Sequence, residues 1–147
     1  MQLTLYTDYS LRVLVYLMLM KDKPVTITEI AEYYNVSRNH LVKIVHNLGL
    51  LGYISTMRGK GGGMTLAMPP EEINIGDVVR NVEPNFNIVE CFSEESPSCK
   101  IEPVCKLKRV LHSASQAFLH ELDSYTLKDV LAKRNTTKVA IDSLLSR

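Results

Sequence analysis

Three cysteines carry the most distinctive chemistry in this sequence. Cys91, Cys99 and Cys105 are its only cysteines, with seven and five residues between them. An odd number of cysteines argues against a disulfide framework, and neither a C-x-x-C pair nor the spacing of a zinc finger is present. Thiolates on one short segment repel each other unless a metal neutralises them, and they are soft ligands. The pattern favours an iron–sulfur or zinc site, with three ordinary free thiols as the alternative.

A metal held by three thiolates needs a fourth ligand. On chemistry alone, the nearby candidates are Glu90, Glu102 and His112. The sequence contains no recognisable Cys/His pair or acid–base dyad. A thiol enzyme is therefore the weakest interpretation.

Positive charge is the second chemical feature, and it is unevenly distributed. The formal net charge is only +1, yet residues 33–70 contain no Asp or Glu. The cationic residues of that stretch are Arg38, Lys43, Arg58 and Lys60. Residues 83–102 reverse the balance, with five Glu against Lys100. Since nearby carboxylates repel DNA phosphates, the acid-free stretch predicts a DNA-binding face.

Turn and capping signals predict the elements that position these charges. We expect a buried helix over residues 9–20, capped by Thr7 or Asp8. Residues 26–29 (TITE) match a capping box, which opens a second helix ending at residue 33 or 34. Asn35 tolerates a left-handed turn, and Ser37 is a good N-cap for a third helix over residues 38–50. The apolar residues of the third helix recur on one face and are Leu41, Ile44, Val45 and Leu48.

A β-hairpin follows directly. Residues 53–58 and 64–68 have strand character and flank a turn that is rich in glycine, residues 59–63 (GKGGG). Two short helices, a tight turn and a hairpin make a winged helix-turn-helix, whose third helix enters the major groove. A thin cationic hairpin tip suits the minor groove. The residues expected to contact DNA are Ser37, Arg38, Asn39, His40, Lys43, Arg58 and Lys60.

The second half of the chain predicts an extended helical appendage. A short helix over residues 74–82, capped by Asn74, precedes a loop over residues 83–103 with two of the cysteines. Residues 105–124 contain no Gly or Pro and predict a long helix, followed by a short one over residues 127–131 and a loosely held tail. The apolar stripe of the long helix is Leu107, Val110, Leu111, Ala114, Ala117, Phe118, Leu122 and Tyr125. A second copy of the chain is its simplest partner, and packing within one chain is the alternative.

The expected fold is therefore mainly α, with a small β-hairpin wing. We expect a DNA-binding domain over residues 1–82, a cysteine-bearing loop over residues 83–104, and a dimerisation helix with tail over residues 105–147. The longest apolar run, residues 13–20, is too short to span a bilayer, and the N-terminus does not read as a signal peptide. These features predict a cytoplasmic protein without a membrane partner.

The sequence resembles the Rrf2 family of winged-helix regulators from Met1 to about Leu131. The matching stretches are residues 7–12 (TDYSLR), 36–41 (VSRNHL), 58–63 (RGKGGG), 75–79 (IGDVV) and 125–127 (YTL). Residues 99–108 (CKIEPVCKLK) are similar to a segment of those members that sense nitric oxide. The resemblance implies a homodimeric repressor of genes for nitric oxide detoxification. Because a two-fold dimer presents two equivalent reading helices, we expect an inverted-repeat operator.

The resemblance also implies an iron–sulfur cluster held by Cys91, Cys99 and Cys105. The [4Fe–4S] type is favoured, and [2Fe–2S] is the alternative. A fourth ligand in such relatives is an aspartate near the N-terminus of the other subunit, which here corresponds to Asp8. The plainer interpretation of Asp8 is an acidic residue in the first turn of a helix, worth roughly 0.3–1 kcal/mol. An iron- or redox-responsive regulator, and a cluster-free regulator controlled by a protein partner, are the other interpretations.

Overall fold

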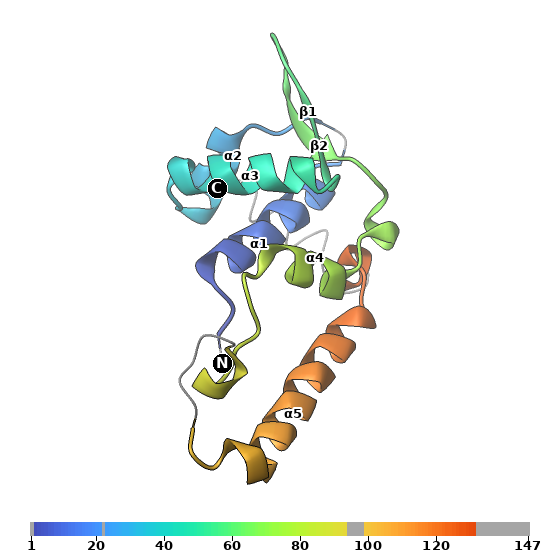
Figure 1. The fold of residues 1–147 in the computed structure, drawn as a ribbon. Coiled ribbons are helices and arrows are strands. Elements are labelled where there is room, and N and C mark those ends of the chain that lie inside the picture. Colours follow the sequence, from blue (N-terminus) through green and yellow to red (C-terminus); the bar gives the residue numbers. More distant parts are fainter. Residues whose placement is uncertain (1, 22, 94–98, 132–147) are drawn as a thin grey trace.

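A computed structural model of the chain describes residues 2–21, 23–93 and 99–131 (Figure 1). Its helices are α1 (Leu5–Leu19), α2 (Ile27–Tyr34), α3 (Arg38–Leu50), α4 (Ile75–Val82) and α5 (Lys106–Asp123). The strands β1 (Ile54–Met57) and β2 (Gly63–Leu66) form an antiparallel hairpin. Short 3₁₀ turns are η1 (Pro70–Glu72), η2 (Glu90–Phe92), η3 (Glu102–Val104) and η4 (Leu127–Val130). The predicted mainly helical fold with a two-stranded wing is confirmed.

Helix α1 begins four residues earlier than predicted. Its N-cap is Thr4, whose hydroxyl accepts a hydrogen bond from the Thr7 backbone N–H at 3.2 Å. The expectation that Thr7 or Asp8 caps this helix was wrong, because Thr7 is fully buried inside the first turn. The buried face farther along α1 includes Val13, Leu14 and Leu17 and joins the main hydrophobic core.

The predicted turn between α2 and α3 is confirmed. The Thr26 hydroxyl accepts the Glu29 N–H at 3.2 Å, and the Glu29 carboxylate accepts the Thr26 N–H at 2.7 Å. This backbone hydrogen bond lowers the pKa of Glu29. Asn35 has a φ of +51°, the left-handed conformation expected of it, and Ser37 is the N-cap of α3 without a side-chain capping bond. All four residues of the predicted apolar face of α3 are buried.

The hairpin lies within a residue or two of its predicted limits. Gly59 and Gly61 have φ values of +101° and +81°, so the tip uses the freedom that only glycine has without strain. The base of the hairpin is tied to the segment before α2. Val25 donates its N–H to the Met64 carbonyl at 3.0 Å, and Met64 donates back to Val25 at 2.8 Å. The wing is thus joined to the helix-turn-helix through the main chain.

The C-terminal half of α5 packs against α4. Asn74, the predicted N-cap of α4, donates its side-chain amide to the Asp123 carbonyl at 2.7 Å. Arg80 donates to the Asp123 carboxylate at 2.8 Å, which lowers the pKa of Asp123. Gly76 is buried beneath this contact, where a Cβ would collide with the Asp123 carboxylate. Leu127 of η4, where a short helix was expected, is fully buried in the core.

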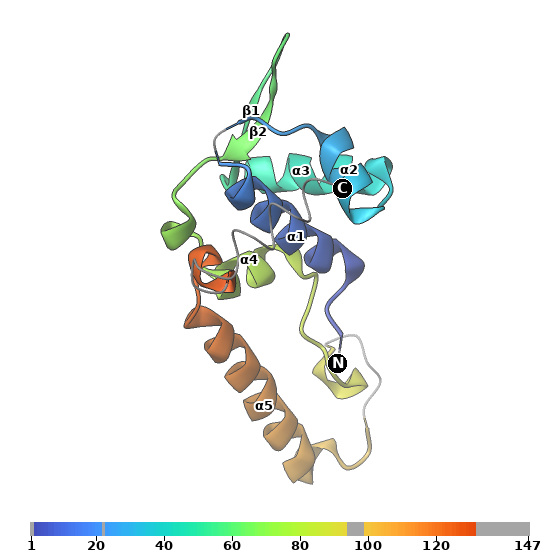
Figure 2. The ribbon, with the colours of Figure 1, turned by 180° about the vertical axis from the view of Figure 1, so that it is seen from behind.

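The N-terminal half of α5 extends away from the other helices, as Figures 1 and 2 show from opposite sides. Leu107 and Val110 of the predicted stripe are each 62% exposed. The α5 residues that are buried within the chain are instead Ser115 and Leu119, which the predicted stripe did not include. Phe118 and Leu122 of the predicted stripe are also partly buried against the core, so packing within the chain uses the C-terminal part of the stripe and leaves Leu107 and Val110 open. No helix in the described ranges is long and apolar enough to cross a membrane.

Candidate DNA interface and cysteine-bearing loop

The outer face of α3 carries every residue that was predicted to contact DNA from this helix. Ser37, Arg38, Asn39, His40 and Lys43 are all exposed. The inner face holds α3 on the core, so these side chains are free to meet a ligand.

Two further residues share this outer face and were missing from the predicted contact set. Val42 is 47% exposed and His46 is also exposed. Val42 follows Arg38 by four residues and Asn39 by three, and His46 follows Val42 by four, so all of them lie on the same side of the helix. Helical periodicity alone could have identified them.

An aromatic cluster fixes the helix-turn-helix against α1. The rings of Tyr33 and Tyr34 lie 4.9 and 6.1 Å from that of Tyr16, measured between centroids. The Tyr34 hydroxyl donates to the Arg12 carbonyl at 3.3 Å. Burial raises the pKa of Tyr34 to about 12, so this phenol keeps its donor proton even in alkaline solution where an exposed tyrosine ionises. Helix α2 is therefore held firmly where it leads into the turn.

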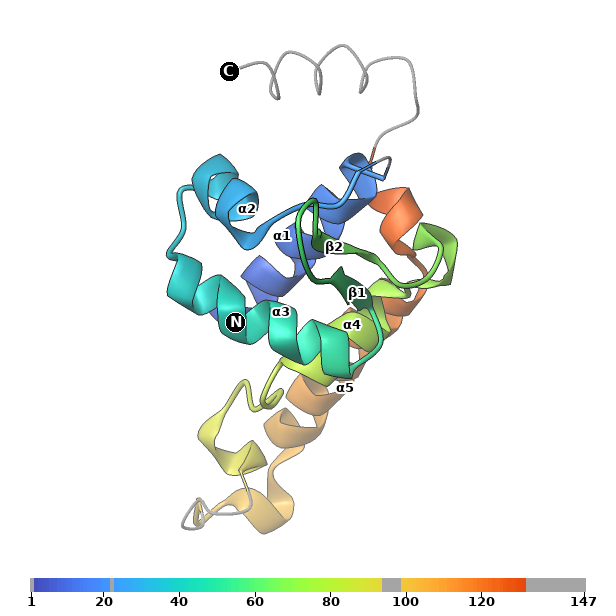
Figure 3. The same cartoon turned by 90° about the horizontal axis from the view of Figure 1, so that it is seen from above.

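The wing tip carries the two other predicted contacts, Arg58 and Lys60, and both are exposed. Figure 3, which looks down on this end of the molecule, shows the hairpin beside α3. Between them lies a hollow of about 380 Å³, whose walls include Arg38, Thr56 and Gly63. Helix α3 and the body of the hairpin flank this hollow, and the cationic tip extends beyond it, which forms a surface on which a DNA backbone could lie.

The segments that carry the three predicted cysteine ligands, around η2 and the start of α5, lie at the opposite end of the molecule from the wing (Figure 1). Cys91 is half-buried in η2, Cys99 is exposed, Cys105 is the half-buried N-cap of α5, and all three are free thiols. The Phe92 ring lies 6.0 Å from that of His112, so η2 contacts the N-terminal half of α5.

Within the described residues, the structure does not bring three His, Cys, Asp or Glu side chains together as a metal site. Of the fourth-ligand candidates suggested by chemistry alone, Glu90 and His112 are exposed. The side chain of Glu102 lies outside the described part of the structure. The ligand set stays a prediction.

Asp8 already has a partner within its own helix. Its carboxylate receives two hydrogen bonds from the Arg12 guanidinium, at 2.9 and 3.0 Å, and both side chains are largely exposed. The guanidinium also lies 5.8 Å from the centroid of the Tyr9 ring and 5.7 Å from that of Tyr34. Arg12 therefore connects Asp8 to the end of α2.

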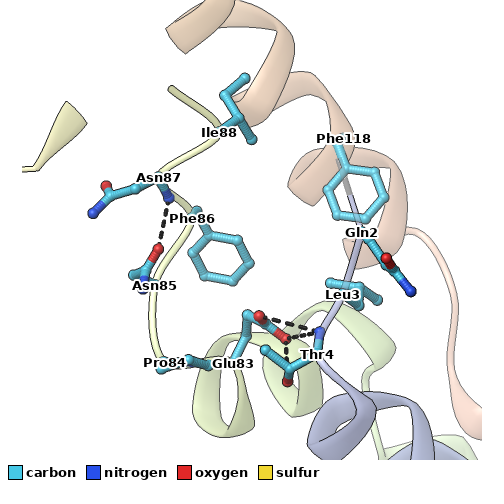
Figure 4. Close-up of a pocket in the computed structure, with 10 residues that line it drawn as sticks. All are labelled: Gln2, Leu3, Thr4, Glu83, Pro84, Asn85, Phe86, Asn87, Ile88 and Phe118. Carbon is cyan, nitrogen blue, oxygen red and sulfur yellow. Dashed lines mark hydrogen bonds between the residues drawn. The ribbon is translucent and has the colours of Figure 1, made fainter. Parts of the chain in front are cut away.

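Glu83 is a structural residue that sequence reasoning missed. It follows α4 directly and begins the cysteine-bearing loop, yet its carboxylate reaches the start of α1 (Figure 4). It accepts the Thr4 N–H and the Thr4 hydroxyl, each at 3.1 Å, and also the Thr7 hydroxyl. These partners precede it by 79 and 76 residues, so no local pattern could have revealed the contact.

Beside this contact is a cavity of about 430 Å³. Its apolar walls come from the N-terminal segment, the loop after α4 and α5. They are Leu3, Phe86, Ile88 and Phe118.

Comparison with known proteins identifies the family. Residues 3–133 match the family described as "Rrf2: Iron-dependent Transcriptional regulator". The HTH-type transcriptional regulator NsrR of Halalkalibacterium halodurans is 53% identical over 136 residues, which cover 92% of this chain and 93% of that protein. NsrR of Bacillus subtilis is 53% identical over 135 residues, which cover 91% and 92%.

Solved structures agree with this assignment. Staphylococcus aureus CymR matches with a TM-score of 0.72 and 28% identity, over 90% of this chain and 100% of that one. CymR of Bacillus subtilis, described as its global cysteine regulator, matches with a TM-score of 0.70 and 27% identity, over 88% and 95%. The chain therefore belongs to the Rrf2 family and is a DNA-binding transcriptional regulator rather than an enzyme.

Proposed function

We propose that the protein is a cytoplasmic, homodimeric repressor. Its high affinity for its operator depends on an iron–sulfur cluster and is lost on exposure to nitric oxide. The observation that carries this proposal is the 53% identity to proteins named NsrR over more than nine-tenths of both chains. Three features of the structure support it: α3 is exposed as a recognition helix would be, the wing is cationic, and one segment carries three free thiols.

DNA recognition would use the outer face of α3 and the wing tip together. Arg38 and Asn39, at the N-terminal end of α3, would reach base edges or phosphates, whereas Lys43 would meet a phosphate. Arg58 and Lys60 would enter the adjacent minor groove, where a narrow groove strengthens the negative potential. The exposure of all five side chains supports this division of roles.

Dimerisation would bury the open stripe of α5. Leu107 and Val110 are each 62% exposed although they are large and apolar, and a second copy offers the same stripe. A two-fold dimer places two reading helices symmetrically. The operator would then be an inverted repeat with half-sites one or more helical turns apart, each turn about 34–36 Å.

The donor chemistry of the loop fits a cluster. Cys91, Cys99 and Cys105 are free thiols, at least partly open to solvent, which suits soft metal ligands. When bound, the cluster would supply iron that reacts with nitric oxide. Asp8 of the partner subunit would be the fourth ligand, and the [4Fe–4S] type is favoured over [2Fe–2S].

The pairing of Asp8 with Arg12 does not oppose this role. Exposed pairs four residues apart on a helix contribute only about 0.3–0.5 kcal/mol, so Asp8 could exchange Arg12 for a metal at little cost. Glu83 ties the start of the cysteine-bearing loop to the start of α1. A rearrangement of the loop would thus reach the helix that carries Asp8 and supports α2.

The test measures affinity for an operator duplex, selected by the protein from a random library, before and after a stoichiometric nitric oxide titration. Protein prepared without oxygen should be coloured, bind tightly and release the duplex as its visible spectrum bleaches. Cys99→Ala should abolish both colour and tight binding. Asp8→Ala keeps three thiolates and should lose less, while Ser113→Ala, an exposed site on α5, is the matched control.

Three results would contradict the proposal. Unchanged affinity despite a bleached spectrum would remove the nitric oxide switch. Release on iron chelation but not with nitric oxide would favour an iron-responsive regulator. A colourless protein that binds the operator equally well would favour control by a protein partner.

A further inference from the structure

Val42 is an apolar side chain on a surface that is otherwise built to meet a polar ligand. It lies on α3, one turn after Arg38 and Asn39 and one turn before His46, and it is 47% exposed. Its neighbour Lys43 is exposed as well. The other side of the helix packs on the core, and about half of the Val42 side chain is open to solvent among the described residues.

The major groove offers one apolar group to such a side chain. Base edges there present hydrogen-bond donors and acceptors, and only thymine adds a methyl group, on C5. A β-branched side chain has few rotamers to lose on binding, so a valine on a rigid helix suits a fixed methyl contact. The position also favours base contact over phosphate contact, because an apolar side chain gains nothing from a phosphate oxygen.

We propose that Val42 determines operator specificity by packing against the C5 methyl group of one thymine in each half-site. This inference rests on the proposed entry of α3 into the major groove. Arg38, Asn39 and Lys43 would set the position of the helix through polar contacts, and Val42 would add a preference for thymine.

The experiment couples one protein substitution to one base modification. In an operator duplex selected by the parent protein from a random library, each thymine is replaced in turn by deoxyuridine, which removes only the C5 methyl group. Fluorescence anisotropy then measures the affinities of the parent, Val42→Ala and Leu50→Ala for every duplex. Leu50 is the matched control, since it is 74% exposed at the far end of the same helix.

Replacing one particular thymine in each half-site by deoxyuridine should change the affinity. Its replacement should weaken the parent and Leu50→Ala by about fourfold, the factor expected for one buried methyl group. For Val42→Ala, the same replacement should change affinity less than twofold. Since alanine favours helices and the site is exposed, Val42→Ala should fold normally, which circular dichroism checks.

Two outcomes would overturn the inference. If Val42→Ala responds to deoxyuridine as strongly as the parent at every position, Val42 reads no methyl group although α3 still binds DNA. If the parent selects no sequence at all, the proposed DNA-binding mode fails together with this inference.

Discussion

The contact between Glu83 and α1 should contribute measurably to folding. The Glu83 carboxylate accepts two hydrogen bonds from Thr4 and one from the fully buried Thr7 hydroxyl. A hydrogen bond to a charged group contributes about 1.5–3 kcal/mol, and partial exposure places these bonds toward the lower figure. The three bonds share one carboxylate and are not additive, so Glu83→Ala, which removes all of them, should cost about 2–3 kcal/mol rather than their sum. Glu83→Gln keeps one acceptor oxygen and the side-chain size, so it should cost about half as much.

Thermal unfolding followed by circular dichroism tests this expectation. For a chain of this size, 1 kcal/mol corresponds to about 2–4 °C, so Glu83→Ala should lower Tm by about 4–12 °C. All samples must have the same protein concentration, because association shifts Tm. Glu72→Ala, which removes an exposed carboxylate in η1, is the control. If Glu83→Ala and Glu72→Ala have the same Tm, the hydrogen bonds at the start of α1 do not stabilise the fold.

Three other substitutions test the fold and the wing. Gly76→Ala places a methyl group against the Asp123 carboxylate and should lower the free energy of unfolding by roughly 1–3 kcal/mol in urea titrations. Glu29→Gln keeps a side-chain oxygen for the capping box but loses the negative charge in the first turn, so it should destabilise the protein at pH 7 by roughly 0.3–1 kcal/mol. Because the folded-state pKa of Glu29 is lowered, its contribution is present above the ordinary Glu pKa and disappears as pH falls through the folded value, so variant and parent should converge in acid. Lys60→Ala should weaken DNA binding and reduce the salt dependence by roughly one counterion; an unchanged salt dependence would contradict the role of the wing.

Features whose causes are local in sequence were predictable. The start of α2 depends on a capping box spanning four residues, and the turn depends on Asn35, which accepts a left-handed conformation. The start of α1 was not predictable. Thr4 and Thr7 are both good N-cap residues by type, and the choice of Thr4 is supported by Glu83, which lies 79 residues away.

The same distinction applies to the candidate sites. The exposed face of α3 follows from helical periodicity, which placed Arg38 and Lys43 outside and would have placed Val42 there. The surroundings of Asp8 could be guessed only in part. Arg12 stands four residues later, at the spacing of a helical ion pair, but its stacking near Tyr34 depends on how α2 packs on α1.

The main-chain bridge between Val25 and Met64 sets how this regulator can tolerate changes in its operator. Since the hairpin base is hydrogen-bonded to the segment that leads into α2, the wing cannot swing independently of the reading helix. One inserted base pair between the major-groove and minor-groove contacts would shift the second contact by about 3.4 Å and rotate it around the duplex. On the proposed binding mode, each half-site therefore has to keep a constant spacing between its major-groove and minor-groove contacts.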